Sequence, residues 1–497
     1  PKVYQLLQKG YTQNIFQFSS KGMTKFLVSM QPDKIEDLIA ANALFRPATL
    51  DSGSTDKYVD CKLGDADPVY LWGTYNAMKN TYGVLCYQEQ LAQIAREVGK
   101  FSLGEGVKLV KLISKKKVDK ILALRDKFMA GANENGCPKE DAEAIWHMFE
   151  VAGGYLFNKS HATAYAVTAY AGAYLKANYP TAFYTIALQW AKDDEIPTLM
   201  SEMELCSEAK IVPPDINVSG GTFITDYETN KIFWSLSRIK MLGAKATEWI
   251  INERNVRGEF SSIENFIERI FRYKLKLYKY WDDPDNPNEA TKCPVNARHV
   301  RHLILSGCFD KVENAQSVIE RYAILEKAAK CLGFEISEKD IPEDLRNKHY
   351  FWSQQQIAIS GIGAIDYKRI YDNSEAKPKI KGKASWALLK NIQDPDYDGK
   401  RVAICANIVD IEEKKFKDKK TGENRVFCKL LLQQNNDLVE MVIWNDEWMN
   451  VRATLCKGGS LSSAKSKMLI CSAQVKYSDY TGGNNLQLYK SSIIDIL

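Results

Sequence analysis

Apolar residues recur at intervals of three and four positions along most of the first 190 residues of this 497-residue chain. That spacing gathers apolar side chains on one face of a helix and is typical of amphipathic α-helices. It is clearest at Ile35–Leu44, Leu91–Val98, Lys108–Ile113 and Ala142–Val151. The pattern predicts one helical domain over residues 1–195, with a boundary near Lys192–Thr198.

The period shortens to two after residue 400, where apolar and β-branched residues alternate with polar ones. Such alternation is typical of strands with one buried face. The alternating segments are 400–414, 425–433, 438–444, 467–480 and 485–497. Five strands fit a small closed barrel of the OB type. We therefore expect a mainly α multidomain chain that ends in an all-β OB-type barrel over residues 396–497.

Aromatic and basic side chains are interleaved in the predicted barrel, at Phe416, Lys417, Arg425 and Tyr480 among others. Stacking surfaces and positive charge together suit single-stranded nucleic acid. Aromatic residues in strands also serve as core, so a purely structural role stays open for some of them.

A helix-hairpin-helix motif is predicted in the module 196–310, where Ser235–Arg254 contains a short apolar element, a tight turn at Gly243 and a helix. Backbone N–H groups in such motifs hold a DNA phosphate without reading sequence. Lys240 and Lys245 flank the turn. Met241 stands where the usual motif has its first glycine, so the hairpin either binds DNA weakly or serves only packing.

A second such element is expected around Asn296–Ser306, which supplies Arg298. Residues 311–395 carry charged helical segments and then a glycine- and lysine-rich stretch, Lys377–Lys383. This composition predicts a helical connector followed by a linker.

The segment Gly154–Tyr165 sets Lys159, Ser160 and His161 at the start of a long helix rich in alanine and tyrosine. We expect Ser160 to be the N-cap and Tyr165 to lie one turn along the face of His161. A helix N-terminus presents unpaired N–H groups to an anion, and Lys159 adds a full charge. Taken alone, the segment also fits an ordinary capped helix with a solvated lysine. Small residues that would let this helix pack closely against a neighbour are Ala162, Ala166, Ala169 and Ala173.

The net charge of +5 does not by itself indicate a nucleic-acid partner, but its distribution is uneven. Lys100–Lys127 contains nine basic residues against three acidic ones, enough to neutralise a polyanion, although a solvated helix face is the alternative. No run of 18 apolar residues is present, so no membrane span is expected. Eleven cysteines without a Cys-x-x-Cys pair predict reduced thiols in a cytoplasm and no zinc site.

Six sequence blocks stand out along the chain, at Ile15–Met23, Ala43–Pro47, Thr81–Gln90, Phe157–Ala166, Val212–Asn217 and Leu303–Asp310. They occur in the order and spacing of the C-family replicative DNA polymerases of bacteria, the DNA polymerase III alpha subunits, and the chain resembles this family over most of 1–310. The resemblance implies that residues 1–195 are the fingers. It places the dNTP triphosphate at Lys159, Ser160, His161, Tyr165, Lys111 and Lys115. Residues expected at DNA are Arg46, Lys116, Lys117, Lys240, Gly243, Lys245, Arg298, Phe416, Lys417, Arg425 and Tyr480.

The carboxylates that such a polymerase needs for two Mg²⁺ ions are not evident. The close acidic groups lie among Gly, Pro or Asn in expected loops, at Asp65/Asp67, Asp282/Asp283/Asp285 and Asp394/Asp396/Asp398. In the family the metal-binding palm precedes the fingers, and Pro1 corresponds to a point just past it. Where relatives carry an Arg-Arg pair, Leu109–Lys116 offers Lys111, a point charge that predicts a weaker triphosphate clamp.

The sequence therefore predicts the fingers and DNA-binding portion of a DNA-directed DNA polymerase, inactive alone. Its palm and Mg²⁺ would come from another chain or a missing N-terminal part, as in a split or phage-encoded version. Expected partners are primer-template DNA, dNTP, a palm-bearing chain, and a sliding clamp or other processivity factor, in a bacterial cytoplasm. The alternative is a non-catalytic DNA-binding or processivity module, but retention of Lys159–His161 and Tyr165 favours the polymerase.

Overall fold

The computed structural model describes residues 1–496 except for several internal segments. The segments left out are 115–117, 153–154, 272–292, 364, 366, 373, 381, 383, 418–421, 436, 457–458, 466, 479–482, 489–493 and 497. The chain forms two compact units, Pro1–Phe183 and Tyr184–Leu497, and the boundary falls within α12 (Pro180–Trp190). Of the predicted site residues, Lys115, Lys116, Lys117 and Tyr480 lie outside the described residues.

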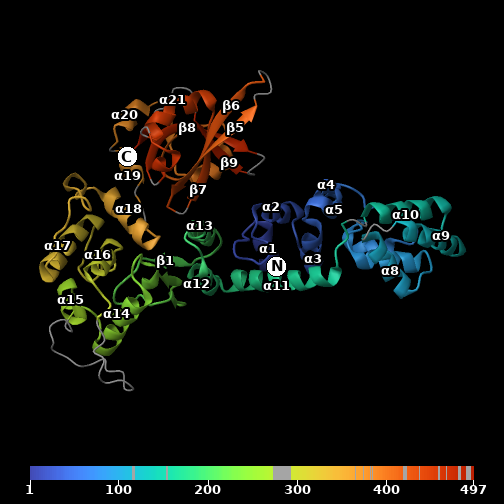
Figure 1. Ribbon diagram of the computed structural model, residues 1–497, viewed down its shortest axis with the longest axis horizontal. Helices are drawn as coiled ribbons and strands as arrows, with labels where there is room; N and C mark the ends of the chain where they lie inside the picture. Colours follow the sequence, from blue (N-terminus) through green and yellow to red (C-terminus); the bar gives the residue numbers. More distant parts are fainter. Residues whose placement is uncertain are drawn as a thin grey trace. The chain divides into compact units, whose positions relative to one another are not determined.

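The first unit is helical, as the apolar spacing predicted (Figure 1). Its helices are α1 (Lys2–Gln8), α2 (Lys21–Met30), α3 (Ile35–Leu44), α4 (Pro47–Asp51), α5 (Ser54–Leu63), α6 (Tyr75–Met78), η1 (Lys79–Thr81), α7 (Gln88–Glu97), α8 (Leu103–Ser114), α9 (Val118–Glu134), α10 (Lys139–Ala152) and α11 (Lys159–Asn178).

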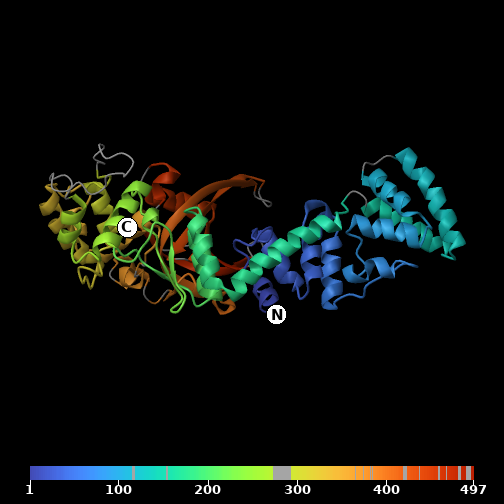
Figure 2. The same cartoon turned by 90° about the horizontal axis from the view of Figure 1, so that it is seen from below.

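Helix α11 packs closely against α1 and α3, as its small residues predicted. Ala162, Ala166, Ala169 and Ala173 are fully buried in one core cluster that also contains Leu38. Their small side chains let the neighbouring helices approach, and Figures 1 and 2 show α11 running alongside them. The N-terminus of α11 is thereby fixed against a rigid helical base.

Helices α7 to α10 form a second core in the same unit. Phe128 and Trp146 are almost fully buried there, with ring centroids 5.4 Å apart. Helix α7 also joins α11, because Gln88 N donates to Phe157 O at 2.9 Å just before α11 begins. The first turn of α7 is therefore held beside the start of α11.

The second unit starts with a small mixed sheet that the sequence did not predict, of β1 (Lys210–Val212), β2 (Ile224–Asp226) and β3 (Lys231–Phe233) in the order β1-β3-β2. Helices then form a core around Trp352 and Phe266. The remaining helices are α13 (Ile196–Cys206), η2 (Leu236–Arg238), α14 (Ala244–Arg257), α15 (Ile263–Phe271), α16 (Ala297–Leu305), η4 (Val318–Glu320), α17 (Arg321–Leu332), η5 (Glu343–Leu345), α18 (His349–Ser360), α19 (Tyr367–Asp372), α20 (Ala376–Ile380), η6 (Asn391–Gln393), η7 (Pro395–Tyr397), α21 (Asn445–Cys456) and η8 (Leu461–Ala464).

Part of the segment Lys377–Lys383, which was predicted to be a linker, is a packed helix. Helix α20 covers its first residues, and Ala376 and Ile380 are buried beside strand residues of the barrel. Alternating apolar residues in this short segment are therefore core contacts despite the surrounding lysines.

The C-terminal part is a closed five-stranded barrel, which confirms the predicted fold class. The sheet of this part contains β4 (Ser385–Trp386), β5 (Arg401–Lys417), β6 (Asn424–Gln434), β7 (Asp437–Ile443), β8 (Met468–Ser478), β9 (Gly483–Leu488) and β10 (Ile494–Ile496). Five of these strands, β5 to β9, form the barrel, and β4 and β10 pair with it from outside. The barrel order is β5-β6-β7-β9-β8, closed by pairing of β8 with β5, and only β7 and β9 pair in parallel within it. This is the topology of an OB fold.

Two details of the barrel differ from the sequence prediction. The segment 485–497 is not one strand, because β9 ends at Leu488 and β10 is a separate short strand on β8. Helix α21 between β7 and β8 was not predicted, and its Trp448 and Leu455 are fully buried under the barrel.

No helix in the described part of the chain has the length and apolar character needed to cross a membrane. Most of the eleven cysteines are buried, whereas Cys331 is exposed.

Candidate nucleic-acid interface

The N-cap of α11 lies two residues earlier than predicted. Asn158, not Ser160, is the N-cap: its Oδ1 accepts the N–H of His161 at 2.9 Å, and Ser160 Oγ donates to the same oxygen at 2.5 Å. Asn158 has extended backbone angles, whereas Lys159 and Ser160 are already helical. Asparagine is as good an N-cap as serine, so the residue at the geometric start of the helix takes the role.

A carboxylate already lies at the N-terminus of α11. Lys159 N donates to Glu89 Oε2 at 2.9 Å, and Glu89 stands in the first turn of α7. The Lys159 ammonium lies 5.6 Å from the ring centroid of Tyr87. Glu89 occupies the position in which an anion is favoured by the helix dipole, and both Glu89 and Lys159 are exposed. Sequence reasoning missed Glu89, because 70 residues separate it from Lys159.

An aromatic row extends from the mouth along α11. His161 lies between Phe157 and Tyr165, with centroid distances of 5.5 and 4.2 Å, and Phe16 follows Tyr165 at 5.1 Å. The Arg46 guanidinium covers Phe157 at 4.5 Å and donates to the carbonyl of Tyr155 at 2.6 Å. Burial lowers the pKa of Arg46, because partial removal from water disfavours its charge. The predicted contact of Tyr165 with His161 is confirmed.

Three cavities surround this helix start. One of 320 Å³ brings together Arg46, His161 and Tyr165 with Ser20. A second of 170 Å³ is lined by Lys159 and Glu89, and a third of 350 Å³ by Asn158, Glu89 and residues of α7 and α8. Lys111 is exposed on α8 and is not among the residues that line these three cavities.

The first helix-hairpin-helix element runs from η2 through the turn to α14. The left-handed residue of the turn is Met241, with φ of 71°, whereas Gly243 is extended and is the N-cap of α14. A side chain cannot cap α14 from Gly243, which leaves the first N–H groups of that helix for a ligand. Lys240 and Lys245 are exposed on either side of the turn.

The second element contains α16, which Asn296 caps through the N–H of His299 at 3.1 Å. Arg298 is exposed in its first turn. Gly307 follows the helix with φ of 90° in the turn that precedes Asp310. This part of the chain thus has a capped helix followed by a tight turn, and the second helix-hairpin-helix element around Asn296–Ser306 stays a prediction.

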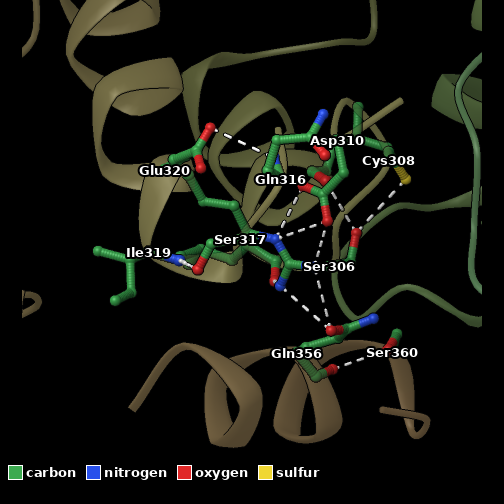
Figure 3. Close-up of polar contacts among 12 residues, drawn as sticks. Ser306, Cys308, Asp310, Gln316, Ser317, Ile319, Glu320, Gln356 and Ser360 are labelled. Carbon is green, nitrogen blue, oxygen red and sulfur yellow. Dashed lines mark hydrogen bonds and ion pairs between the residues drawn. The ribbon is translucent and has the colours of Figure 1, made fainter. Parts of the chain in front are cut away.

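A buried arginine fixes this second turn. Arg321 Nε donates to both carboxylate oxygens of Asp310, at 2.9 and 3.0 Å, and Arg321 Nη1 donates to Gln356 Oε1 at 3.1 Å and to Leu305 O at 3.2 Å. Figure 3 shows Ser306, Asp310 and Gln356 converging from the end of α16, the turn and α18. A Cβ on Gly307 would lie 2.5 Å from Arg321 Nη2, so only glycine fits.

The barrel carries an aromatic cluster at one end. Phe416, Phe427 and Trp444 have ring centroids 5.3 to 5.8 Å apart, and Trp444 is 43% exposed. Lys417 is exposed beside Phe416, whereas Arg425 is half-buried and pairs with Glu423 at 3.5 Å. The cluster thus combines an exposed indole with nearby positive charge.

The described residues do not fit a divalent-metal site. No three His, Cys, Asp or Glu side chains among them converge on one point. Asp394 caps η7, and Asp398 accepts the N–H of Tyr477, while Asp282, Asp283 and Asp285 lie outside the described residues.

A helix-hairpin-helix motif together with an OB-type barrel defines a DNA-binding class of protein. Residues 1–136 match the family described as the bacterial DNA polymerase III alpha subunit finger domain, and residues 208–279 match the helix-hairpin-helix motif. DNA polymerase III subunit alpha of Aquifex aeolicus is 34% identical over 331 residues, 66% of this chain and 27% of that protein. That of Borreliella burgdorferi is 34% identical over 64% of this chain and 26% of that protein.

The match to DNA polymerase III subunit alpha of Escherichia coli extends over the barrel as well. It is 28% identical over 518 aligned residues, which cover 100% of this chain and 41% of that protein. This chain is thus similar to bacterial DNA polymerase III alpha subunits, and to that of Escherichia coli along its whole length. It spans between a quarter and two fifths of the length of these relatives.

Proposed function

We propose that this chain is the nucleotide- and DNA-binding portion of a replicative DNA-directed DNA polymerase. Residues 1–195 are the fingers, 196–310 the helix-hairpin-helix module, 311–395 the connector and 396–497 the OB-type domain. The palm and its Mg²⁺ ions come from another chain or from a part outside this sequence. The observation that carries the proposal is the mouth of α11, where a lysine, a helix N-terminus and an aromatic row meet.

In this proposal the triphosphate of an incoming dNTP binds at the mouth of α11. Lys159 and the helix N-terminus supply positive charge, and the N–H that Glu89 now accepts is the kind of donor that a phosphate oxygen uses. Arg46 and His161 face the adjoining 320 Å³ cavity. These residues position and neutralise the phosphates, which is most of what phosphoryl transfer requires.

Duplex DNA is held by its backbone at the hairpins. The N–H groups at the start of α14 meet one phosphate, Lys240 and Lys245 flank it, and Arg298 serves the second element. None of these groups reads base edges, which suits an enzyme that copies any sequence. A sliding clamp or other processivity factor is a further proposed partner.

Single-stranded template is bound by the aromatic cluster of the barrel. We expect Trp444→Ala to weaken binding of the full chain to a fluorescent oligothymidylate by about 1–3 kcal/mol, because one base loses its stacking surface. Added salt should weaken binding of both proteins to a similar degree, since the phosphate contacts remain. The matched control is Tyr227→Ala, which removes an aromatic side chain that is 67% exposed outside the barrel. Equal affinities of the Trp444 and Tyr227 variants would show that the cluster does not stack on bases.

The second candidate function is a non-catalytic DNA-binding or processivity module. The exposed lysines at the first hairpin, Lys240 and Lys245, fit either function, whereas the N-terminus of α11 at Lys159 favours nucleotide binding. One measurement distinguishes the two candidate functions. If the chain is a polymerase portion, adding it to a palm-bearing chain should produce primer extension, whereas a non-catalytic module should not.

A further inference from the structure

The hairpin Ile239–Gly243 contains a residue in a conformation that its side chain disfavours. Met241 has φ of 71°, and its side chain is 59% exposed, so no packing of that side chain requires this backbone shape. A non-glycine residue is disfavoured in the left-handed conformation, because its Cβ comes too close to the following carbonyl oxygen. Ile239 and Leu242 are buried on either side, and Leu242 N donates to Ile239 O at 3.1 Å. The turn is therefore tight, and contacts from outside it must offset the cost at Met241.

A histidine of α16 supplies such a contact. His302 Nδ1 donates to Lys240 O at 2.5 Å. The peptide group that precedes the Met241 Cα is thereby held by a helix of the second element.

His299 caps the helix that carries His302. Asn296 N donates to His299 Nδ1 at 3.3 Å, so Nδ1 is the acceptor. Burial, His302 and Arg298 lower the pKa of His299, which favours this neutral ring. The first turn of α16, which contains His299, is thereby fixed below His302.

A second contact holds the other side of the Lys240 residue. Lys240 N donates to Ile359 O at 2.8 Å, at the end of α18, and Trp234 Nε1 donates to the next carbonyl, that of Ser360, at 2.8 Å. Both backbone groups of Lys240 are thus satisfied by other elements. By contrast, the turn after α16 places Gly307 at its left-handed position, where no side chain opposes the conformation.

We propose that His302 is a positioning residue for DNA-backbone binding by the first hairpin. It holds the carbonyl of Lys240, and so stabilises the turn that a glycine at position 241 would adopt unaided. It acts through the orientation of the N–H groups at the start of α14. This inference rests on the proposed role of that hairpin in holding a DNA phosphate.

The test compares variants of the full chain in binding to a short fluorescent duplex. We expect His302→Ala to weaken binding about two- to tenfold, the effect of one lost hydrogen bond. His302→Asn, which keeps a donor near the position of Nδ1, should retain most of the affinity. Met241→Gly should restore the affinity of His302→Ala, because glycine adopts the left-handed conformation without support. Loss of binding that Met241→Gly does not restore would overturn the inference, as would wild-type affinity of His302→Ala.

Amide hydrogen exchange of the DNA-free chain tests the positioning role of the histidine independently of whether the hairpin binds DNA. In the DNA-free chain, His302→Ala should speed exchange over residues 240–246, and Met241→Gly should slow it again. If Lys245→Ala leaves duplex affinity unchanged, the hairpin does not hold DNA and that part of the proposed function fails. Even then, the exchange rates over residues 240–246 test whether His302 positions the hairpin. Unchanged exchange rates in His302→Ala would contradict that positioning role.

Discussion

Replacing Lys159 by Ala is expected to raise the apparent KM for all four dNTPs about ten- to a hundredfold in the polymerase assembled with its palm. The loss of one charge-assisted phosphate contact costs about 1.5–3 kcal/mol, and this lysine stands at a helix mouth that already favours an anion. The effect should be similar for the four bases, because the contact is to phosphate. Steady-state primer extension over a range of dNTP concentrations measures it.

Two further variants make the Lys159 result specific. Lys57→Ala removes an equal charge from an exposed position on α5 and should leave KM unchanged. Lys245→Ala should weaken retention of DNA equally across sequences without changing the KM for nucleotides, since it flanks the hairpin. Wild-type nucleotide kinetics for the Lys159 variant would mean that α11 is only a packing element.

Replacing Arg321 by Met is expected to lower the free energy of unfolding of the second unit by about 3–5 kcal/mol. Arg321 is 2% exposed and joins Asp310, Gln356 and the carbonyl of Leu305, so its loss leaves buried polar groups without their partner. Denaturant unfolding followed by the fluorescence of Trp352, buried in the same core, measures the change.

The matched control is Arg301→Met in the neighbouring helix. Arg301 pairs with Asp340 on the surface, with the two side chains 25% and 46% exposed. Solvent screens such a pair, so its loss should cost at most about 1 kcal/mol. Equal losses for the two variants would contradict the assignment of Arg321 as the residue that fixes the second turn.

The elements that could be predicted from sequence are those with strong periodicity. Ile35–Leu44 is a helix with the predicted bounds, and the long β5 and β8 alternate clearly enough to show a barrel. Helix α21 was missed because only Trp448, Leu455 and Cys456 along it are buried, which gives no regular apolar stripe. The strands β1 to β3 have three residues each, too few for a pattern.

The candidate site was predictable where its chemistry is local. Lys159, His161 and Tyr165 fall within two turns of one helix, so the sequence alone placed them together. Glu89 and Arg46 reach the same site from distant segments, and only the packing of α7 and α3 beside α11 brings them there. The hydrogen bond from His302 to Lys240 likewise joins residues that are 62 positions apart, so no spacing rule could have indicated it.

The central claim is that this chain supplies nucleotide and DNA binding to a polymerase whose metal-bearing palm lies elsewhere. The most direct measurement is primer extension with Mg²⁺ by the purified chain, by a palm-bearing polymerase chain of the same family, and by their mixture. We predict extension by the mixture and none by this chain alone. Extension by this chain alone, or a mixture no more active than the palm-bearing chain by itself, would contradict the claim.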